Sequence, residues 1–201
     1  PVFIPVHGYK TIPNLAVPYG AIRFWVAPNW STASDRNAGS GPGHAARLME
    51  MVRMNTEIPS VQWSLYVNET GDAIYLHAFA DSAVVEVLKA PAEFSAGDWN
   101  MITLAYSPTN TVLWLNGEVI GEGNGLPLSS AAEPKDLALV IGSDWLCSAN
   151  TMADAQFEEV TTLERWPGRS DLQRLYFQAY KEQSLLGPVS EEEAAAAAKS
   201  R

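Results

Sequence analysis

Cysteine, positive charge and long apolar runs are all scarce in this sequence. Cys147 is the single cysteine among 201 residues, so no internal disulfide can form, and we interpret it as a small buried apolar residue. Lys and Arg number 13 against 23 Asp and Glu, and the formal net charge is -10. Because like charges repel, this balance argues against nucleic acid and anionic membrane surfaces as partners. No apolar run reaches the roughly 18 residues of a membrane-spanning helix, so we expect no membrane insertion.

Motifs that carry catalytic or metal chemistry are also missing. The sequence contains no HExxH, CxxC, Walker or GxSxG pattern, and the GSGPGH stretch at 39–44 lacks the third glycine of a dinucleotide fingerprint. His7, His44 and His77 are far apart, with no spacing typical of transition-metal ligands. We therefore expect no enzymatic activity and no required cofactor.

Short runs with period-two alternation recur along the chain, separated by clusters of Gly, Pro, Asn and Asp. Trp63, Leu65 and Val67 alternate with polar neighbours, and Asn116-Gly117 supplies the two positive-φ residues of a type I′ hairpin turn. This pattern predicts one all-β domain, a two-sheet antiparallel sandwich, in place of alternating strands and helices. We expect its core to include the residues Ile22, Phe24, Leu104, Tyr106, Leu113, Leu115 and Ile141.

One helix is predicted near the C-terminal end. Ser170 and Gln173 have the spacing of a capping box, which predicts a short helix over 171–181. The apolar stripe that follows has a helical period: Leu172, Leu175, Tyr176 and Ala179. Residues 188–201 are low in complexity and rich in Glu and Ala, which is typical of an exposed tail or linker, so we assign the sandwich to residues 1–187. Because residue 1 is Pro and not Met, we expect the chain to be a piece of a longer protein.

Four motifs follow one another in a characteristic order. They are FWVAPNW at 24–30, GDWNMITLAYSPTNTVLWLNGEVIG at 97–121, LVIGSDW at 139–145 and DAQFEEVTTLERWP at 154–167. In this order they resemble the laminin-G-like jelly roll of the concanavalin A-like lectin and glucanase superfamily, although Ala155 stands where a glycine is common. The resemblance covers about residues 20 to 180 and implies two antiparallel sheets, one of them concave, with loops at the rim. It implies no single activity, because the fold carries lectins, glucanases and structural modules.

The resemblance bears on catalysis and on metal binding. Glucanases of the superfamily place Glu-x-Asp-x-Glu on one strand, so that three carboxylates face the scissile bond, and this triplet is absent here. Laminin-G-like domains often hold one Ca²⁺ at a sheet edge through Asp side chains and backbone carbonyls. The resemblance therefore leaves Ca²⁺ open as a cofactor, although loop aspartates also cap turns. The candidate ligands in predicted loops are Asp35, Asp72, Asp81 and Asp144.

Aromatic residues are the remaining candidates for a ligand site. Alternation places Tyr75 and His77 on one face of a strand, and it places Trp114 opposite to its leucine neighbours. Trp30 and Trp145 each follow a polar loop residue, as expected at a rim. Flat rings with nearby amides and carboxylates suit sugars, but aromatic residues are also favoured in strands for packing alone.

From these residues and the resemblance we expect a non-catalytic binding or adhesion module that binds carbohydrate. It would belong to a larger extracellular or cell-surface protein, with glycans or a protein as partner. The alternative is a structural spacer or assembly module that has no glycan ligand.

Overall fold

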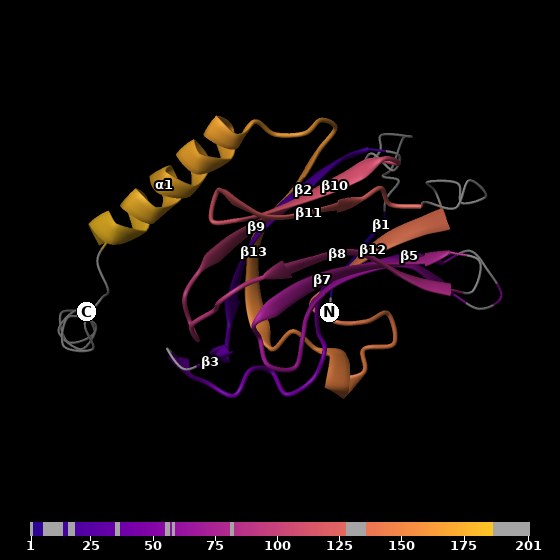
Figure 1. The fold of residues 1–201 in the computed structure, drawn as a ribbon, viewed down its shortest axis with the longest axis horizontal. Helices are drawn as coiled ribbons and strands as arrows, with labels where there is room; N and C mark the ends of the chain where they lie inside the picture. Colours follow the sequence, from indigo (N-terminus) through magenta and orange to yellow (C-terminus); the bar gives the residue numbers. More distant parts are fainter. Residues whose placement is uncertain are drawn as a thin grey trace, which may run out of the picture.

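The computed structural model describes residues 2–5, 14–15, 19–34, 37–54, 57, 59–80, 83–127 and 136–186. These residues form two antiparallel β-sheets that pack face to face, with one helix on the outer side of one sheet (Figure 1). The two-sheet sandwich predicted from the alternation is confirmed. The tail predicted for 188–201 lies outside the described residues.

The larger sheet has six strands in the order β1-β12-β5-β6-β7-β8, and the smaller has five in the order β11-β10-β9-β2-β13. The six-stranded sheet consists of β1 (Val2–Pro5), β12 (Leu137–Ile141), β5 (Ala46–Arg53), β6 (Ser60–Val67), β7 (Ala73–Ala80) and β8 (Ala83–Pro91). The five-stranded sheet consists of β11 (Glu118–Asn124), β10 (Asn110–Leu115), β9 (Asn100–Tyr106), β2 (Gly20–Pro28) and β13 (Ala155–Leu163). A small ladder of β3 (Ala33–Ser34) and β4 (Asn37–Ala38) follows β2, and the 3-10 helix η3 (Ala149–Thr151) follows β12.

The core lies between the sheets and is built from alternate residues of each strand. In β7, Ile74, Leu76 and Ala78 are almost fully buried, whereas the residues between them point outward. Burial of each large aliphatic side chain stabilises the fold by about 1.5–3 kcal/mol. Of the predicted core residues, Leu115 is half-buried against the core, and the others are buried: Ile22, Phe24, Leu104, Tyr106, Leu113 and Ile141.

The predicted hairpin between β10 and β11 is confirmed. Asn116 and Gly117 have φ values of 55° and 83°, and Leu115 pairs with Glu118 on either side of the two-residue turn. The Asn116 Oδ1 accepts a hydrogen bond from the backbone N–H of Met101 at 2.8 Å. This contact fastens the turn to the start of the neighbouring strand β9.

One side of the sandwich is closed where β11 of one sheet approaches β8 of the other. A Cβ on Gly121 would lie 2.8 Å from the Cβ of Ala90, and a Cβ on Gly123 would lie 2.2 Å from the carbonyl oxygen of Val87. Real Cβ atoms do not come so close, so glycine at these two positions allows the edges of the sheets to meet.

The helix α1 (Arg169–Leu186) is longer than the segment predicted for it. It begins before Ser170, because the Gly168 carbonyl accepts the N–H groups of Asp171 and Leu172 at 3.0 and 3.1 Å. The capping box predicted at Ser170 is therefore wrong, since this residue lies in the first turn. Leu172 is buried, whereas Leu175 is exposed, so the contact face of the helix is narrower than the predicted stripe.

The helix covers part of the outer face of the five-stranded sheet (Figure 1). A second apolar cluster forms there, in which Leu172 packs among Ala21, Trp25, Met101, Ala105, Val112 and Trp114. Within the part of the chain that the structure describes, no helix is both long enough and apolar enough to cross a membrane. Cys147, expected to be buried, is exposed in the loop after β12 with φ 58°.

Candidate functional site

The structure distributes the five predicted ligand-binding residues over four places. Tyr75 and His77 lie on the outer face of the six-stranded sheet, with ring centroids 5.9 Å apart. Trp114 lies on the outer face of the five-stranded sheet, Trp30 lies in the core, and Trp145 lies in the loop between β12 and η3. The candidate site is therefore the surface around Tyr75 and His77.

Two rows of side chains run across β5, β6, β7 and β8 on this surface, and we call them together the outer-face cluster. The residues of the first row, which pair in register from strand to strand, are Arg47, Tyr66, Tyr75 and Lys89. The residues of the second row, which pair in the same way, are Glu50, Ser64, His77 and Glu86. Neighbouring strands lie about 4.8 Å apart, so each row spans about 15 Å.

The first row is a stack of rings with a cation at each end. Tyr66 and Tyr75 stack with ring centroids 5.4 Å apart and an interplanar angle of 11°. The Arg47 guanidinium carbon lies 4.6 Å from the Tyr66 ring centroid, and the Lys89 Nζ lies 5.1 Å from that of Tyr75. The faces of both rings are thus occupied by one another and by the cations, and the ring edges remain available.

His77 links the two rows. Its ring meets both tyrosine rings edge to face, with centroids 5.2 Å from Tyr66 and 5.9 Å from Tyr75. The His77 Nδ1 lies 3.3 Å from the Tyr66 hydroxyl, whose pKa is raised by burial. The Nε2 atom lies 3.8 Å from a Glu86 carboxylate oxygen, too far for a hydrogen bond, and has no hydrogen-bond partner among the described residues.

Glu50 is a buried carboxylate, 2% exposed, at the β5 end of the second row. Burial raises its pKa, and the backbone N–H of Trp145, which donates to Oε1 at 3.1 Å, acts in the opposite direction. The charge of Arg47 also lowers the pKa of Glu50. The Arg47 Nη1 donates to the Ser64 Oγ at 2.9 Å. The side chains at this end of the cluster therefore fix one another in place.

The outer-face cluster offers polar groups in fixed positions. Phenol, imidazole, ammonium and carboxylate groups can donate and accept hydrogen bonds to a hydroxylated ligand. The carboxylates of Glu50 and Glu86 are separated in the row by Ser64 and His77. The arrangement can therefore hold a hydroxylated ligand through several groups at once.

Two of the predicted tryptophans do not present a free ring. The rim position expected for Trp30 is wrong, because its side chain is 8% exposed, its Nε1 donates to the Ala153 carbonyl at 2.9 Å, and it packs edge to face on Phe94. Trp114 points outward, as its parity predicted, but it is 6% exposed and packs in the cluster beneath α1. Trp145 is half-buried, and a ligand role for it stays a prediction.

Two of the four candidate calcium ligands, Asp72 and Asp144, lie among the described residues, and a metal role for the four stays a prediction. The Asp72 carboxylate accepts hydrogen bonds from Asn68 at 2.6 Å and Thr70 at 2.9 Å, and these contacts lower its pKa. The Asp144 carboxylate accepts the backbone N–H of Ser148 at 2.8 Å. Both aspartates thus cap their own turns. Asp35 and Asp81 lie outside the described residues, and the described residues contain no group of three His, Cys, Asp or Glu side chains suited to a metal ion.

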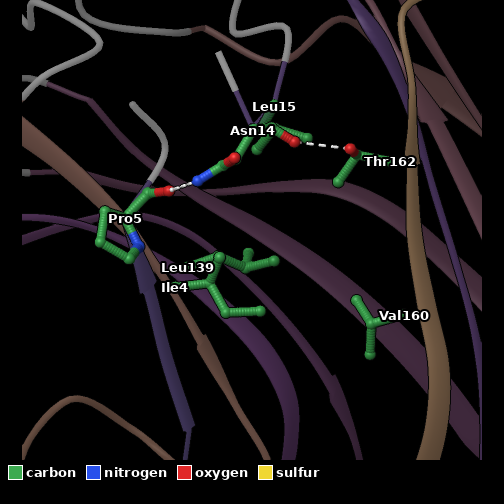
Figure 2. A pocket seen from close by; sticks show the side chains of 7 residues that line it. All are labelled: Ile4, Pro5, Asn14, Leu15, Leu139, Val160 and Thr162. Carbon is green, nitrogen blue, oxygen red and sulfur yellow. Dashed lines mark hydrogen bonds between the residues drawn. The ribbon is translucent and has the colours of Figure 1, made fainter. Parts of the chain in front are cut away.

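A separate pocket of about 250 Å³ opens between β12 and β13 (Figure 2). The strand orders place it at the edge of the sandwich opposite to β8 and β11. Its walls are mainly aliphatic, with Ile4, Leu139 and Val160 facing one another. The Asn14 Nδ2 donates to the Pro5 carbonyl at 2.8 Å, so this polar group of the wall is paired within the wall. None of the predicted site residues lines this pocket.

Sequence reasoning found Tyr75 and His77 and missed the other six residues of the outer-face cluster. Tyr66 alternates with the apolar residues Leu65 and Val67, so it points to the opposite face of its strand, as Tyr75 does on its own strand. A comparison of the two alternations could have placed both tyrosines on one face of the sheet. Arg47 and Glu50 gave no such signal, because residues on both faces of β5 are largely buried and two register shifts interrupt its pairing with β6.

Residues 9–171 match the family model described as the concanavalin A-like lectin/glucanases superfamily, and this range is more than half of the chain. None of the curated proteins matches the chain. The family match agrees with the sandwich and with the motif order in the sequence.

Several solved structures have a similar fold. One concerns botulinum neurotoxin type C, whose cell entry is described as dependent on interaction with two ganglioside molecules (12% identity, TM-score 0.55, 82% of this chain and 36% of that chain). A second is the binding domain of Paraclostridial Mosquitocidal Protein 1 (10% identity, TM-score 0.54, 85% of this chain and 39% of that chain). A third is Trypanosoma rangeli sialidase in complex with sialic acid (10% identity, TM-score 0.53, 79% of this chain and 22% of that chain). The chain spans well under half the length of each, and at these identities the likeness shows the fold alone.

Proposed function

The chain belongs to the concanavalin A-like lectin/glucanases superfamily, and from this premise we propose that it is a non-catalytic module that binds glycans through the outer-face cluster. The observation that carries the proposal is the contrast between the two outer faces. The helix α1 covers part of the five-stranded sheet, whereas the six-stranded sheet presents an ordered array of tyrosine, histidine and charged side chains.

The charges around the cluster favour a neutral glycan. Four carboxylates accompany the two cations of the first row. Glu50 and Glu86 belong to the cluster, Asp144 interacts electrostatically with Glu50, and Asp72 interacts electrostatically with Lys89. Four carboxylates against two cations repel an anionic ligand. Because the tyrosine ring faces are occupied, recognition proceeds by hydrogen bonds from ring edges and charged groups to sugar hydroxyls.

The site has room for more than one sugar residue. At the Lys89 end, the first row runs into a polar groove of about 520 Å³ between β8 and β11, lined in part by Glu86, Lys89, Glu122 and Asn124. A ligand that crosses the outer-face cluster from Arg47 reaches this groove without leaving the surface. We therefore propose an oligosaccharide as the ligand.

The similar structures support the glycan class without fixing the sugar. The descriptions of two of them name gangliosides and sialic acid as what those proteins bind. The absence of the glucanase carboxylate triplet from the sequence supports a module without catalysis. We also propose a secreted or cell-surface location and a longer parent protein, in which residues 188–201 act as a linker.

The experiment is a glycan array that carries neutral and acidic oligosaccharides, followed by calorimetric titration of any glycan that binds. Tyr75→Phe removes only a hydroxyl, Tyr75→Ala removes the ring, and Tyr19→Ala, at an exposed tyrosine outside the cluster, is the matched control. We expect a neutral glycan to bind, Tyr75→Ala to weaken binding about tenfold, and Tyr19→Ala to leave it unchanged. Equal binding by all three variants would overturn the assignment of the site.

The alternative is a spacer or assembly module. It is favoured by exposed apolar residues on two edge strands, Val2 and Phe3 on β1 and Val84 and Val85 on β8. An array without any bound glycan, together with a concentration-dependent oligomer in analytical ultracentrifugation, would favour this alternative.

A further inference from the structure

A third row of side chains crosses the outer face of the five-stranded sheet, and it differs in kind from the outer-face cluster. The row pairs in register across β10, β9, β2 and β13, and its residues are Trp114, Thr103, Arg23 and Thr161. Tryptophans surround this row. Trp25 and Trp114 lie in the apolar cluster beneath α1, and Trp99 and Trp166 pack against it.

Three polar atoms of this row have no partner among the described residues. They are the Trp114 Nε1, the Thr103 Oγ1 and the Arg23 Nε, all of them buried. The Trp114 residue is 6% exposed, and Thr103 is fully buried. Buried polar groups are paired in most proteins, so three unpaired groups on neighbouring strands call for an explanation by a ligand or by water.

The chemistry of these atoms defines what would pair with them. The indole and guanidinium N–H groups only donate, and the threonine hydroxyl can donate as well. Arg23 is half-buried, and its one polar contact is from Nη2 to the Thr161 hydroxyl at 3.3 Å. Among the described residues no carboxylate forms an ion pair with Arg23 within 4.0 Å. Glu158 lies three residues before Thr161 on β13, opposite Trp25 and across a register shift. The row therefore lacks an anionic acceptor.

We propose that this row is a second binding site, which takes the carboxylate of an acidic sugar, and that α1 is its displaceable cover. The proposal goes beyond the neutral glycan site, because it concerns the opposite outer face and a ligand of opposite preference. Arg23 supplies the charge, Trp114 and Thr103 supply hydrogen bonds, and the surrounding tryptophans supply apolar walls for the sugar ring.

Among the described side chains of the helix, few contact this face. Of its described side chains, Leu172 alone is buried, and Tyr176 stacks on Trp25 with centroids 6.0 Å apart and an interplanar angle of 21°. At its start, Arg169 and Gln173 bind the exposed Glu118. Surface ion pairs of this kind contribute little, so the cost in free energy of moving α1 away comes mainly from exposing Leu172 and the apolar cluster beneath it. Tyr176 then vacates the face of Trp25.

The test is a fluorescence titration of the intact chain, because four of its seven tryptophans lie in or against this cluster. The probes are N-acetylneuraminic acid and its methyl ester, which keeps the sugar and removes the charge. We expect the acid to shift the emission with saturation and the ester to have no effect. Arg23→Met is expected to weaken binding about tenfold or more, and Thr103→Val several-fold.

The cover is tested separately. Leu172→Ala loosens α1, and we expect it to tighten binding of the acid several-fold, because a smaller part of the binding free energy is used to displace the helix. Tyr19→Ala is the control variant, and the melting of each variant is measured in parallel. If Arg23→Met does not fold, Thr103→Val and the acid-to-ester comparison decide.

Three results would overturn the proposal. The first is an equal response to the acid and the ester, which would leave only a buried water at the row. The others are an unchanged affinity for the acid in Arg23→Met and an affinity that does not rise in Leu172→Ala. The two sites fail independently. An array on which no neutral glycan binds contradicts the first site, whereas the absence of a fluorescence response to the acid contradicts this one.

Discussion

A Cβ on Gly117 would lie 3.0 Å from the Cα of Gln173, so the β10–β11 turn and α1 are in direct contact. Gly117 is therefore required twice, once by its φ of 83° and once by the helix above it. This contact connects the hairpin, which the sequence shows clearly, with a helix whose position the sequence does not show.

The two requirements at Gly117 can be separated by substitution. Gly117→Ala is expected to lower the free energy of unfolding by about 2–3 kcal/mol, from positive φ and from overpacking together. Gly97 has a φ of 82° with no atom within 4 Å of its virtual Cβ, so Gly97→Ala reports the φ effect alone, about 1 kcal/mol. Urea denaturation measures both. Equal losses would show that α1 does not press on the turn.

Trp30 is predicted to stabilise the core and not to bind ligand. Trp30→Ala is expected to cost about 3–5 kcal/mol, because it removes a buried indole and its hydrogen bond to Ala153. Trp145→Ala, at a half-buried loop position, is expected to cost less than half as much. Thermal melting of the two variants measures the difference. A Trp30→Ala variant that melts like the parent would contradict a core role for Trp30 and leave a ligand role open.

Much of the fold follows from the sequence because its signals are local. The Asn116-Gly117 turn and the alternation of Trp63, Leu65 and Val67 each depend on nearby residues, and the structure confirms them. The start of α1 was misplaced because Gly168, a weaker N-terminal signal than Ser170, provides the first carbonyl.

The site was only partly predictable, because it depends on pairing between strands. Tyr75 and His77 were found by parity, but their partners Tyr66 and Lys89 meet them only through the register of three strands. The burial of Trp114 depends on a helix more than fifty positions later in the chain. No local pattern contains such information.

The raised pKa of Glu50 predicts a dependence of stability on pH. A carboxyl whose folded pKa exceeds its unfolded value binds more protons in the folded state, so its contribution to stability falls as pH rises from about 4.5 through the folded pKa. Glu50→Gln keeps an acceptor for the Trp145 N–H and removes the buried charge. We expect its melting temperature, relative to the parent, to be about 2–4 °C higher at pH 7.5 than at pH 4. A difference that is constant across pH would contradict this prediction.

Calcium is predicted to leave melting unchanged. Asp72 and Asp144 already accept hydrogen bonds from their own turns, so a cation there would have to displace these contacts. An ion that binds only the folded state raises the melting temperature by mass action. We therefore compare melting in millimolar Ca²⁺ and in excess chelator. A rise of several degrees with Ca²⁺ would contradict the prediction and direct attention to Asp35 and Asp81.

Gly123 is predicted to control both the closure of the sandwich and the far end of the glycan site. A Cβ on Gly123 would lie 2.2 Å from the carbonyl oxygen of Val87, so Gly123→Ala must move β11 away from β8. Overpacking of this kind costs about 1–3 kcal/mol. Because Gly123 lines the groove between Glu86 and Glu122, the same movement widens the groove.

The ligand then separates the two effects of Gly123→Ala. If an oligosaccharide extends from Tyr75 into the groove, the variant should bind the longer glycans of an array more weakly and bind the shortest ones as the parent does. Gly43→Ala is the control for a glycine replaced without overpacking, because Gly43 has a φ of 73° and no atom lies within 4 Å of its virtual Cβ. If Gly123→Ala weakened the binding of short and long glycans equally, the groove would make no contact of its own, and the ligand would be confined to the outer-face cluster.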